Sequence, residues 1–208
     1  MNLAGAERAA ICDTFEKVGP EQPTLCGEWN THDLLAHLLV RERQPWASGG
    51  IMVPFLAFLT DHAMRGYATT PWAEMIGKLR AGAPVWSPFA IGKVDVLANT
   101  AEFYVHHEDV RRGVPGWEPR EPDAARDEEL WSLVLRSARM MYRNSPVGIV
   151  LRRPGGEEHV VHTGKGVVTL TGEPGELLLH AYGRDEVRID VMGAESDKDA
   201  LAKTSRGI

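Results

Sequence analysis

The chain has 208 residues, of which 43% are hydrophobic and 25% are charged, and its 29 acidic and 23 basic residues give a formal net charge of -6. This balance is ordinary for a globular protein and excludes an intrinsically disordered chain. Lys and Arg never occur in a run longer than two residues. The sequence therefore has no basic patch of the kind that binds nucleic acid or anionic lipid, and we expect neither partner.

No apolar segment approaches the roughly 20 residues that a membrane-spanning helix needs. The N-terminal segment also lacks the basic start and continuous apolar stretch of a secretory signal. The two cysteines, Cys12 and Cys26, are too few for a disulfide scaffold. We therefore expect a cytoplasmic protein, either a monomer or a homodimer, with reduced thiols and no membrane partner.

Apolar residues recur at helical spacing over the first two thirds of the chain, between glycine, proline and polar capping residues. Asn30 or Thr31 is the expected N-cap of the second helix, and Pro45 marks its end. This pattern predicts a helical bundle over residues 1–145. Its expected helices are 3–18, 31–43, 54–66, 71–80, 93–112 and 123–144.

From Val147 onward the pattern alternates between apolar and polar residues, which is typical of strands. Gly155-Gly156 and Gly164-Lys165-Gly166 separate three short strands, and both separators predict hairpins. The expected strands are 148–154, 158–163, 167–172 and 187–192, with helices over 173–182 and 197–203. We therefore predict an α+β fold in which a small α/β domain, residues 146–208, follows the bundle.

The long expected helix over 93–112 carries Glu102 and His106, four residues apart. This spacing places both side chains on one helix face, close enough to share a metal ion. The alternative is a solvated polar face, and an isolated Glu-x-x-x-His pair does not distinguish the two. Asp109 lies one turn further along. It either orients His106 by a hydrogen bond or forms an exposed ion pair with Arg111 or Arg112. His107 points away from His106, and we expect it at the surface or an interface.

The second helix supplies a third candidate ligand, His37, which lies among four leucines at positions 34, 35, 38 and 39. A histidine in such a setting is either a core residue or a ligand, and bundle cores do host metal sites built from facing helices. Three protein ligands with an open position are typical of catalytic zinc, although the same set suits non-haem iron(II). Cys26 is either a fourth ligand or redox thiol, or a buried anchor of the loop before this helix.

These segments resemble the mycothiol-dependent maleylpyruvate isomerase family, a branch of the DinB-like metal-binding four-helix bundles. The family pattern is a Trp before a helix with Asp-Leu-x-x-His, then Glu-x-x-x-His-x-x-Asp on a later helix. Segment 167–185 is similar to that family's sterol-carrier-like C-terminal domain, so the resemblance covers nearly the whole chain. The residues that match the bundle pattern are Trp29, Asp33, Leu34, His37, Glu102, His106 and Asp109.

The resemblance implies a divalent metal, usually zinc, held by His37, Glu102 and His106, with the thiol of mycothiol at the open position. In the isomerase the thiolate would add to a cis double bond, allow rotation and leave again; in S-transferase relatives it would stay attached. Arg184 matches the family's Gly-Arg pair and suits a carboxylate of mycothiol or substrate, unless it simply pairs with Asp185 or Glu186.

The candidate catalytic residues are thus Asp109 and Arg184, and the candidate cofactor-binding residues are Arg184 and Arg41, which is otherwise a solvated helix-end charge. Our leading hypothesis is a metal- and mycothiol-dependent isomerase or S-transferase acting on an electrophilic small molecule. The alternatives are a non-catalytic metal- or ligand-binding module and a thiol or metal sensor that uses Cys26.

Overall fold

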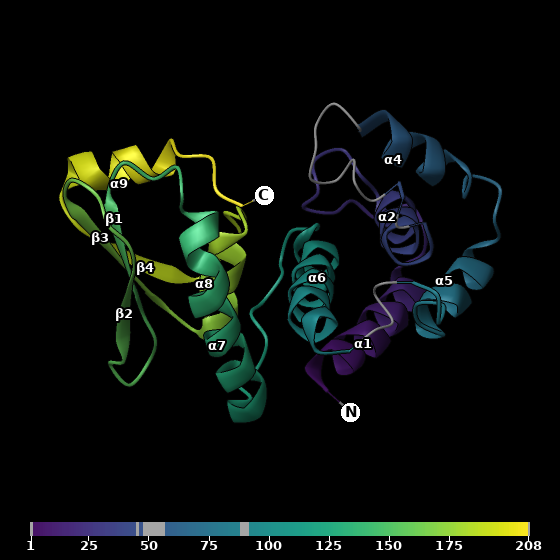
Figure 1. Cartoon of the computed structure of the whole chain (residues 1–208), viewed down its shortest axis with the longest axis horizontal. Helices are drawn as coiled ribbons and strands as arrows, with labels where there is room; N and C mark the ends of the chain where they lie inside the picture. The colour runs from purple at the N-terminus through teal and green to yellow at the C-terminus, as the bar shows by residue number, and fades with distance from the viewer. Residues whose placement is uncertain (1, 45, 48–56, 88–91, 208) are drawn as a thin grey trace. The chain divides into compact units, whose positions relative to one another are not determined.

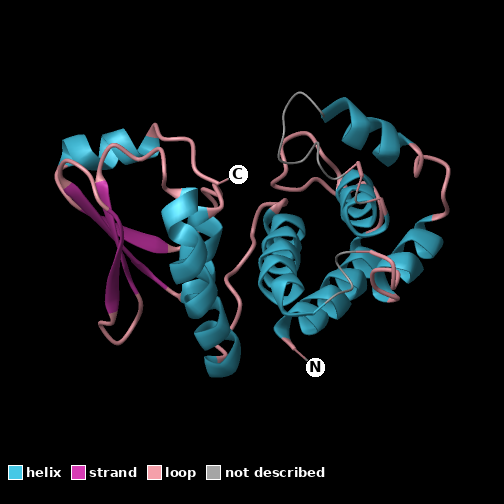
Figure 2. Cartoon of the chain, in the orientation of Figure 1, coloured by secondary structure: helices cyan, strands magenta, loops and turns pink. Residues whose placement is uncertain are grey.

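The computed structural model describes residues 2–44, 46–47, 57–87 and 92–207. Their contacts divide the chain into two compact units, Met1–Glu118 and Pro119–Ile208. Helices make up the first unit, and helices with a mixed sheet make up the second (Figure 2). The predicted α+β class is therefore confirmed. Within the described residues, no helix is long and apolar enough to cross a membrane.

The first unit is built from helices whose ends match the capping signals in the sequence. Asn2 caps the first helix, and Asn30 caps the second through a capping box with Asp33, so the predicted bounds of both helices are confirmed. Helix α1 packs against α5 and α6, while α2 packs against α4 and α5 (Figure 1). The helices are α1 (Leu3–Val18), α2 (Thr31–Arg43), α4 (Ala57–Arg65), α5 (Trp72–Arg80) and α6 (Gly92–Arg112). The predicted start of α4, at residue 54, lies outside the described residues.

The core of this unit is apolar and centred on α2, which is buried from Leu34 to Glu42. Burial of whole leucine or phenylalanine side chains contributes about 1.5–3 kcal/mol each, so this cluster fixes the position of α2. His37 therefore lies on a rigid element rather than on a loop. The fully buried side chains of this core include Ile11, Phe15, Leu34, Leu35, Leu38, Leu39, Met75, Leu79 and Phe103.

The loop between α1 and α2 folds back onto the C-terminal end of α6. The backbone N–H of Leu25 donates to the carbonyl of Asp109 at 3.1 Å, and Nε2 of Gln22 donates to the carbonyl of Val110 at 2.8 Å. Gly113 allows this close approach, because a Cβ there would lie 2.1 Å from the carbonyl oxygen of Pro23. The α1–α2 loop is thus fixed to the helix that carries two of the candidate ligands.

The second unit has a four-stranded sheet in the order β2-β1-β3-β4. Its strands are β1 (Gly148–Arg152), β2 (Glu158–His162), β3 (Val167–Gly172) and β4 (Ile189–Met192). The predicted hairpin at Gly155-Gly156 is confirmed, because β1 pairs antiparallel with β2. The second predicted hairpin, at 164–166, is wrong: β3 pairs parallel with β1 instead, so the three residues join strands that are not neighbours.

Helix α7 (Ala124–Met141) packs against α8 (Pro174–Ala181) and contacts β2, while α8 and α9 (Glu195–Ala202) both contact β3. Fully buried side chains on α7, α8 and the sheet form this unit's core, among them Leu130, Val134, Ile149, Leu151, Val168, Leu170 and Leu177. The two units are therefore not divided at 145/146, where the pattern changes from helix to strand, because α7 makes its contacts with the sheet and α8.

Candidate metal centre

Three side chains from two helices converge in the first unit. Nε2 of His37 on α2 lies 3.2 Å from Oε1 of Glu102 on α6, and Nε2 of His106, one turn further along α6, lies 3.4 Å from the same oxygen. One donor atom from each residue lies within 4.8 Å of the other two. The structure thus brings together the three residues that the sequence and the resemblance single out as metal ligands.

These separations fit a tetrahedral ion. With metal–ligand bonds of about 2.0–2.1 Å, two ligand atoms of a tetrahedral zinc site lie about 3.3–3.4 Å apart, which is close to the distances from Oε1 of Glu102 to the two imidazole nitrogens. Two imidazole nitrogens and one carboxylate oxygen also form the donor set of an open catalytic site. The residues present therefore fit a divalent ion with a coordination position left for another molecule.

The other carboxylate oxygen of Glu102 faces a guanidinium. Nε of Arg41 lies 3.6 Å from Oε2, and Nη1 of the same arginine donates to Oδ1 of Asn99 at 2.5 Å. This arginine is buried, with 7% of its surface exposed. Its contact with Oε2 leaves Oε1 directed at the two imidazoles. Arg41 thus orients a candidate metal ligand, a contact that the sequence did not predict.

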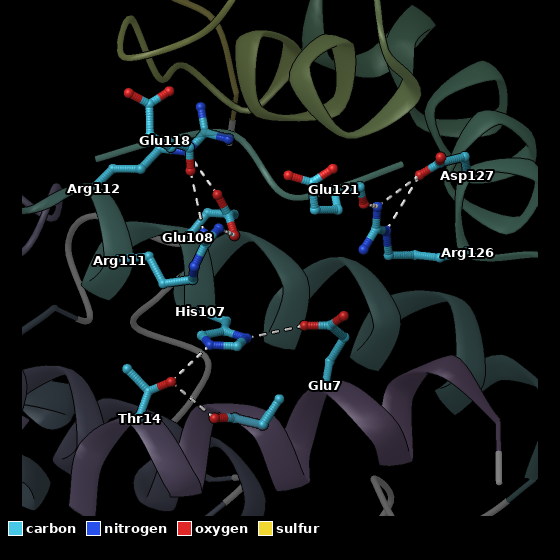
Figure 3. A network of polar contacts seen from close by, with 11 residues as sticks. Glu7, Thr14, His107, Glu108, Arg111, Arg112, Glu118, Glu121, Arg126 and Asp127 are labelled. Carbon is cyan, nitrogen blue, oxygen red and sulfur yellow. Dashed lines mark hydrogen bonds and ion pairs between the residues drawn. The ribbon is translucent and has the colours of Figure 1, made fainter. Parts of the chain in front are cut away.

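Asp109 supports His106 from the other side of the imidazole. Nδ1 of His106 lies 2.8 Å from Oδ2 of Asp109, which is fully buried. A carboxylate only accepts, so Nδ1 carries the proton and donates it, which in the neutral imidazole leaves the lone pair on Nε2. Of the two alternatives for Asp109, the structure shows the one in which it orients His106. Arg111 and Arg112 both donate to Glu108, at 2.5 and 2.6 Å (Figure 3).

Burial and hydrogen bonds together shift the pKa values of the three candidate ligands. Burial lowers the pKa of His37 and keeps its imidazole neutral, the form that binds metals. Burial alone would raise the pKa of Glu102, but hydrogen bonds from His106 and His37 hold it well below its usual value. Burial would also lower the pKa of His106, yet its bonds with Asp109, Cys26 and Glu102 raise it well above the ordinary value.

Two rings pack against the imidazole of His37. Its ring centroid lies 5.2 Å from that of Trp29 and 5.2 Å from that of His106. Among the described residues, its buried Nδ1 has no hydrogen-bond partner. The position of this imidazole is therefore set by packing of α2 and by the contact of Nε2 with Glu102. Trp29 packs on this candidate ligand directly.

Two other sequence expectations have different outcomes. His107 is buried rather than at the surface: its Nδ1 pairs with Glu7 at 3.1 Å and its Nε2 with Thr14 at 2.9 Å, both on α1 (Figure 3). The prediction failed because α1 packs on this face of α6.

Arg184 lies in the second unit, where Nη1 donates to the carbonyl of Tyr182 at 2.6 Å. Its carboxylate-binding role stays a prediction.

The fold is shared with solved structures. A crystal structure of a mycothiol-dependent maleylpyruvate isomerase matches with a TM-score of 0.57 and 13% identity, over 91% of this chain and 90% of that one. A histidine-to-alanine mutant of that isomerase matches with a TM-score of 0.58 and 14% identity over the same shares. No family model and no curated protein sequence matches the chain. The similarity shows a common fold across both units.

Proposed function

We propose that this protein is a metal-dependent enzyme of the mycothiol-dependent maleylpyruvate isomerase family, acting as an isomerase or S-transferase on an electrophilic small molecule. The observation that carries the proposal is the convergence of Nε2 of His37, Oε1 of Glu102 and Nε2 of His106. The shared fold supports it, because the solved isomerase structures have the same architecture over nine tenths of the chain.

The ligand set carries the chemistry of the proposal. His37, Glu102 and His106 would hold the ion, most simply zinc, and leave a position for a low-molecular-weight thiol such as mycothiol. A thiol bound to such an ion is deprotonated, so a weak nucleophile becomes a thiolate at neutral pH. The scarcity of cysteine in the chain is consistent with this chemistry, because the reactive sulfur arrives with the cofactor.

The neighbouring residues have supporting roles in this proposal. Arg41 and Asn99 direct Oε1 of Glu102 toward the ion, and Asp109 keeps His106 in the tautomer that binds metal. Arg184 would bind a carboxylate of the thiol cofactor or the substrate through its planar guanidinium. Arg41 was also predicted to bind the cofactor, and its buried contact with Glu102 gives it a positioning role in the proposal instead.

A structural metal site is the rival function, and Cys26 is the residue that would close it. Sγ of Cys26 lies beside Nδ1 of His106 and Oδ2 of Asp109. The nitrogen of His106 that faces Glu102, and would bind the ion together with His37, is Nε2. The two ring nitrogens point in different directions, so this placement favours the open, catalytic site.

The test is a thiol-consumption assay on zinc-loaded protein, with mycothiol, glutathione and a panel of electrophiles that includes maleylpyruvate and other activated alkenes. The expected result is consumption or isomerisation with mycothiol that is lost in Glu102→Ala and retained in His62→Ala, which replaces an exposed histidine of α4. A zinc-loaded protein that is inactive with every pair of thiol and electrophile would support the structural-site rival instead.

A further inference from the structure

We propose that Cys26 is a positioning residue for the metal ligand His106, acting through Asp109; the inference rests on the proposed metal site. Sγ of Cys26 donates to Oδ2 of Asp109 at 3.0 Å and lies 3.7 Å from Nδ1 of His106. The same carboxylate oxygen accepts the bond from Nδ1 at 2.8 Å. The thiol, the carboxylate and the imidazole thus form a triad on the side of the ring that faces away from Glu102.

The α1–α2 loop is built to hold the thiol at this point. Oγ1 of Thr24 accepts from the backbone N–H of Cys26 at 3.1 Å, and the carbonyl of Cys26 accepts from Trp29 at 3.2 Å. The next residue toward the N-terminus, Leu25, donates its N–H to the carbonyl of Asp109. The loop therefore contacts Asp109 twice, once through backbone and once through the cysteine side chain.

The carboxylate of Asp109 is fully buried in the first unit, where it depends on hydrogen-bond donors. A buried carboxylate without hydrogen bonds is strongly unfavourable, and the orientation of this one decides which way the imidazole of His106 turns. The bond from Cys26 adds a second donor to Oδ2 and restrains rotation of the carboxylate. Outer-shell partners of this kind typically change metal affinity by about 10–100-fold.

The experiment uses cobalt(II) alone, because its absorption spectrum reports both geometry and sulfur ligation. Wild type, Cys26→Ser and Cys26→Ala are titrated with cobalt, with Cys12→Ala as the control for loss of a buried thiol elsewhere. We expect Cys26→Ala to bind about tenfold more weakly with an altered ligand-field band. We expect Cys26→Ser, which keeps a donor to Asp109, to retain affinity and spectrum, and wild type to lack a thiolate-to-cobalt charge-transfer band.

Three outcomes would overturn the inference. If Cys26→Ala binds cobalt with the affinity and spectrum of wild type, the cysteine does not position His106, although the proposed metal site survives. A charge-transfer band that disappears in Cys26→Ser would make Cys26 a ligand. Wild type that binds no cobalt overturns the proposed function and this inference together.

A second measurement covers the case in which Cys26→Ala does not fold. Long-range proton–nitrogen NMR of zinc-loaded wild type and Cys26→Ser reports which nitrogen of His106 carries the proton. Both proteins should show protonated Nδ1 and metal-bound Nε2. If Nδ1 carries no proton in wild type, the hydrogen-bonded triad is absent and the inference fails.

Discussion

His180 is a buried histidine of the second unit that the proposed metal site does not use. It lies on α8, and its Nδ1 is 2.7 Å from the hydroxyl of Tyr142 at the end of α7. Burial, with a smaller effect of Arg206, lowers its pKa from 6.5 to about 3. The hydroxyl of Tyr142 thus shares a hydrogen bond with a neutral imidazole, and burial raises the pKa of this tyrosine as well.

The low pKa of His180 predicts acid-sensitive stability. In the unfolded chain this histidine takes a proton near pH 6.5, but in the folded protein only near pH 3. Its contribution to the free energy of unfolding is therefore complete above pH 6.5 and is lost progressively as the pH falls from 6.5 to 3. The slope due to this one group approaches about 1.4 kcal/mol per pH unit inside that window.

Urea unfolding at several pH values between 4 and 7 measures this slope. His180→Asn should be less stable than wild type at pH 7. The slope of its free energy of unfolding against pH should be smaller than that of wild type by the contribution of about one proton. His62→Asn, at an exposed position of α4, is the matched control and should keep the wild-type slope. Equal pH dependence in His180→Asn and wild type would contradict the assignment.

The candidate ligands and, as one of two alternatives, the support of His106 by Asp109 were predictable, whereas the other supporting contacts were not. Helical spacing places Glu102 and His106 on one helix face, and His37 in a leucine-rich helix, together with the family resemblance, favours a metal site there. The burial of Arg41 against Glu102 and the bond from Cys26 to Asp109 depend on contacts between segments far apart in the sequence. A spacing rule along one helix contains no information about such contacts.

At the scale of elements, the junction between the α1–α2 loop and α6 positions the candidate site. Gly113 is its tightest point, because a Cβ there would meet the Pro23 carbonyl oxygen at 2.1 Å and Cα of Thr24 at 2.7 Å. Both contacts are with backbone, so no side chain can turn aside to relieve them. The absence of a side chain at this position is therefore a requirement of the fold.

Gly113→Ala is expected to destabilise the first unit by about 1–3 kcal/mol through overlap, and to weaken metal binding because the loop carries Cys26. Gly77→Ala is the matched control: its Cβ would meet nothing within 4 Å, and it lies inside α5. Removing a glycine from an exposed helix interior stabilises by about 0.5–1 kcal/mol. Thermal melts measure the stability of both variants. If both are stabilised, or both are destabilised, relative to wild type, this account is contradicted.

The capping signals also show which features of the elements were predictable. Asn30 was one of two expected caps for α2, and the structure assigns it with Asp33 in a capping box. The strand order was not predictable in the same way. Gly164 and Gly166 signal a turn, yet β3 pairs in parallel with β1 and not with β2, which precedes it in the chain.

At the scale of the whole molecule, the candidate metal site lies within one of the two compact units. All three candidate ligands, with Cys26, Arg41 and Asp109, lie in Met1–Glu118, whereas Arg184 and His180 lie in Pro119–Ile208. The sequence predicted an all-helical unit followed by an α/β unit. It did not predict that α7 belongs with the sheet, because a helical pattern does not reveal which element the helix packs against.

This separation predicts that metal stabilises one unit selectively. Differential scanning calorimetry with and without zinc should show one transition that moves to higher temperature and one that does not move. At a free zinc concentration 100 times the dissociation constant, the stabilisation of the first unit should be about 2.7 kcal/mol. The shift should disappear in His37→Ala. A zinc-induced shift of equal size in both transitions, or in His37→Ala, would contradict the assignment of the site to the first unit.

Metal content measures the central claim most directly, because every other proposal depends on the trio of His37, Glu102 and His106. Wild type, His37→Ala, His106→Ala and the control His62→Ala are purified without added metal and analysed for their elements. The account predicts about one divalent ion per chain in wild type and His62→Ala, and loss of that ion in both ligand variants. Wild type without stoichiometric metal, together with unchanged content in His37→Ala and His106→Ala, would contradict it.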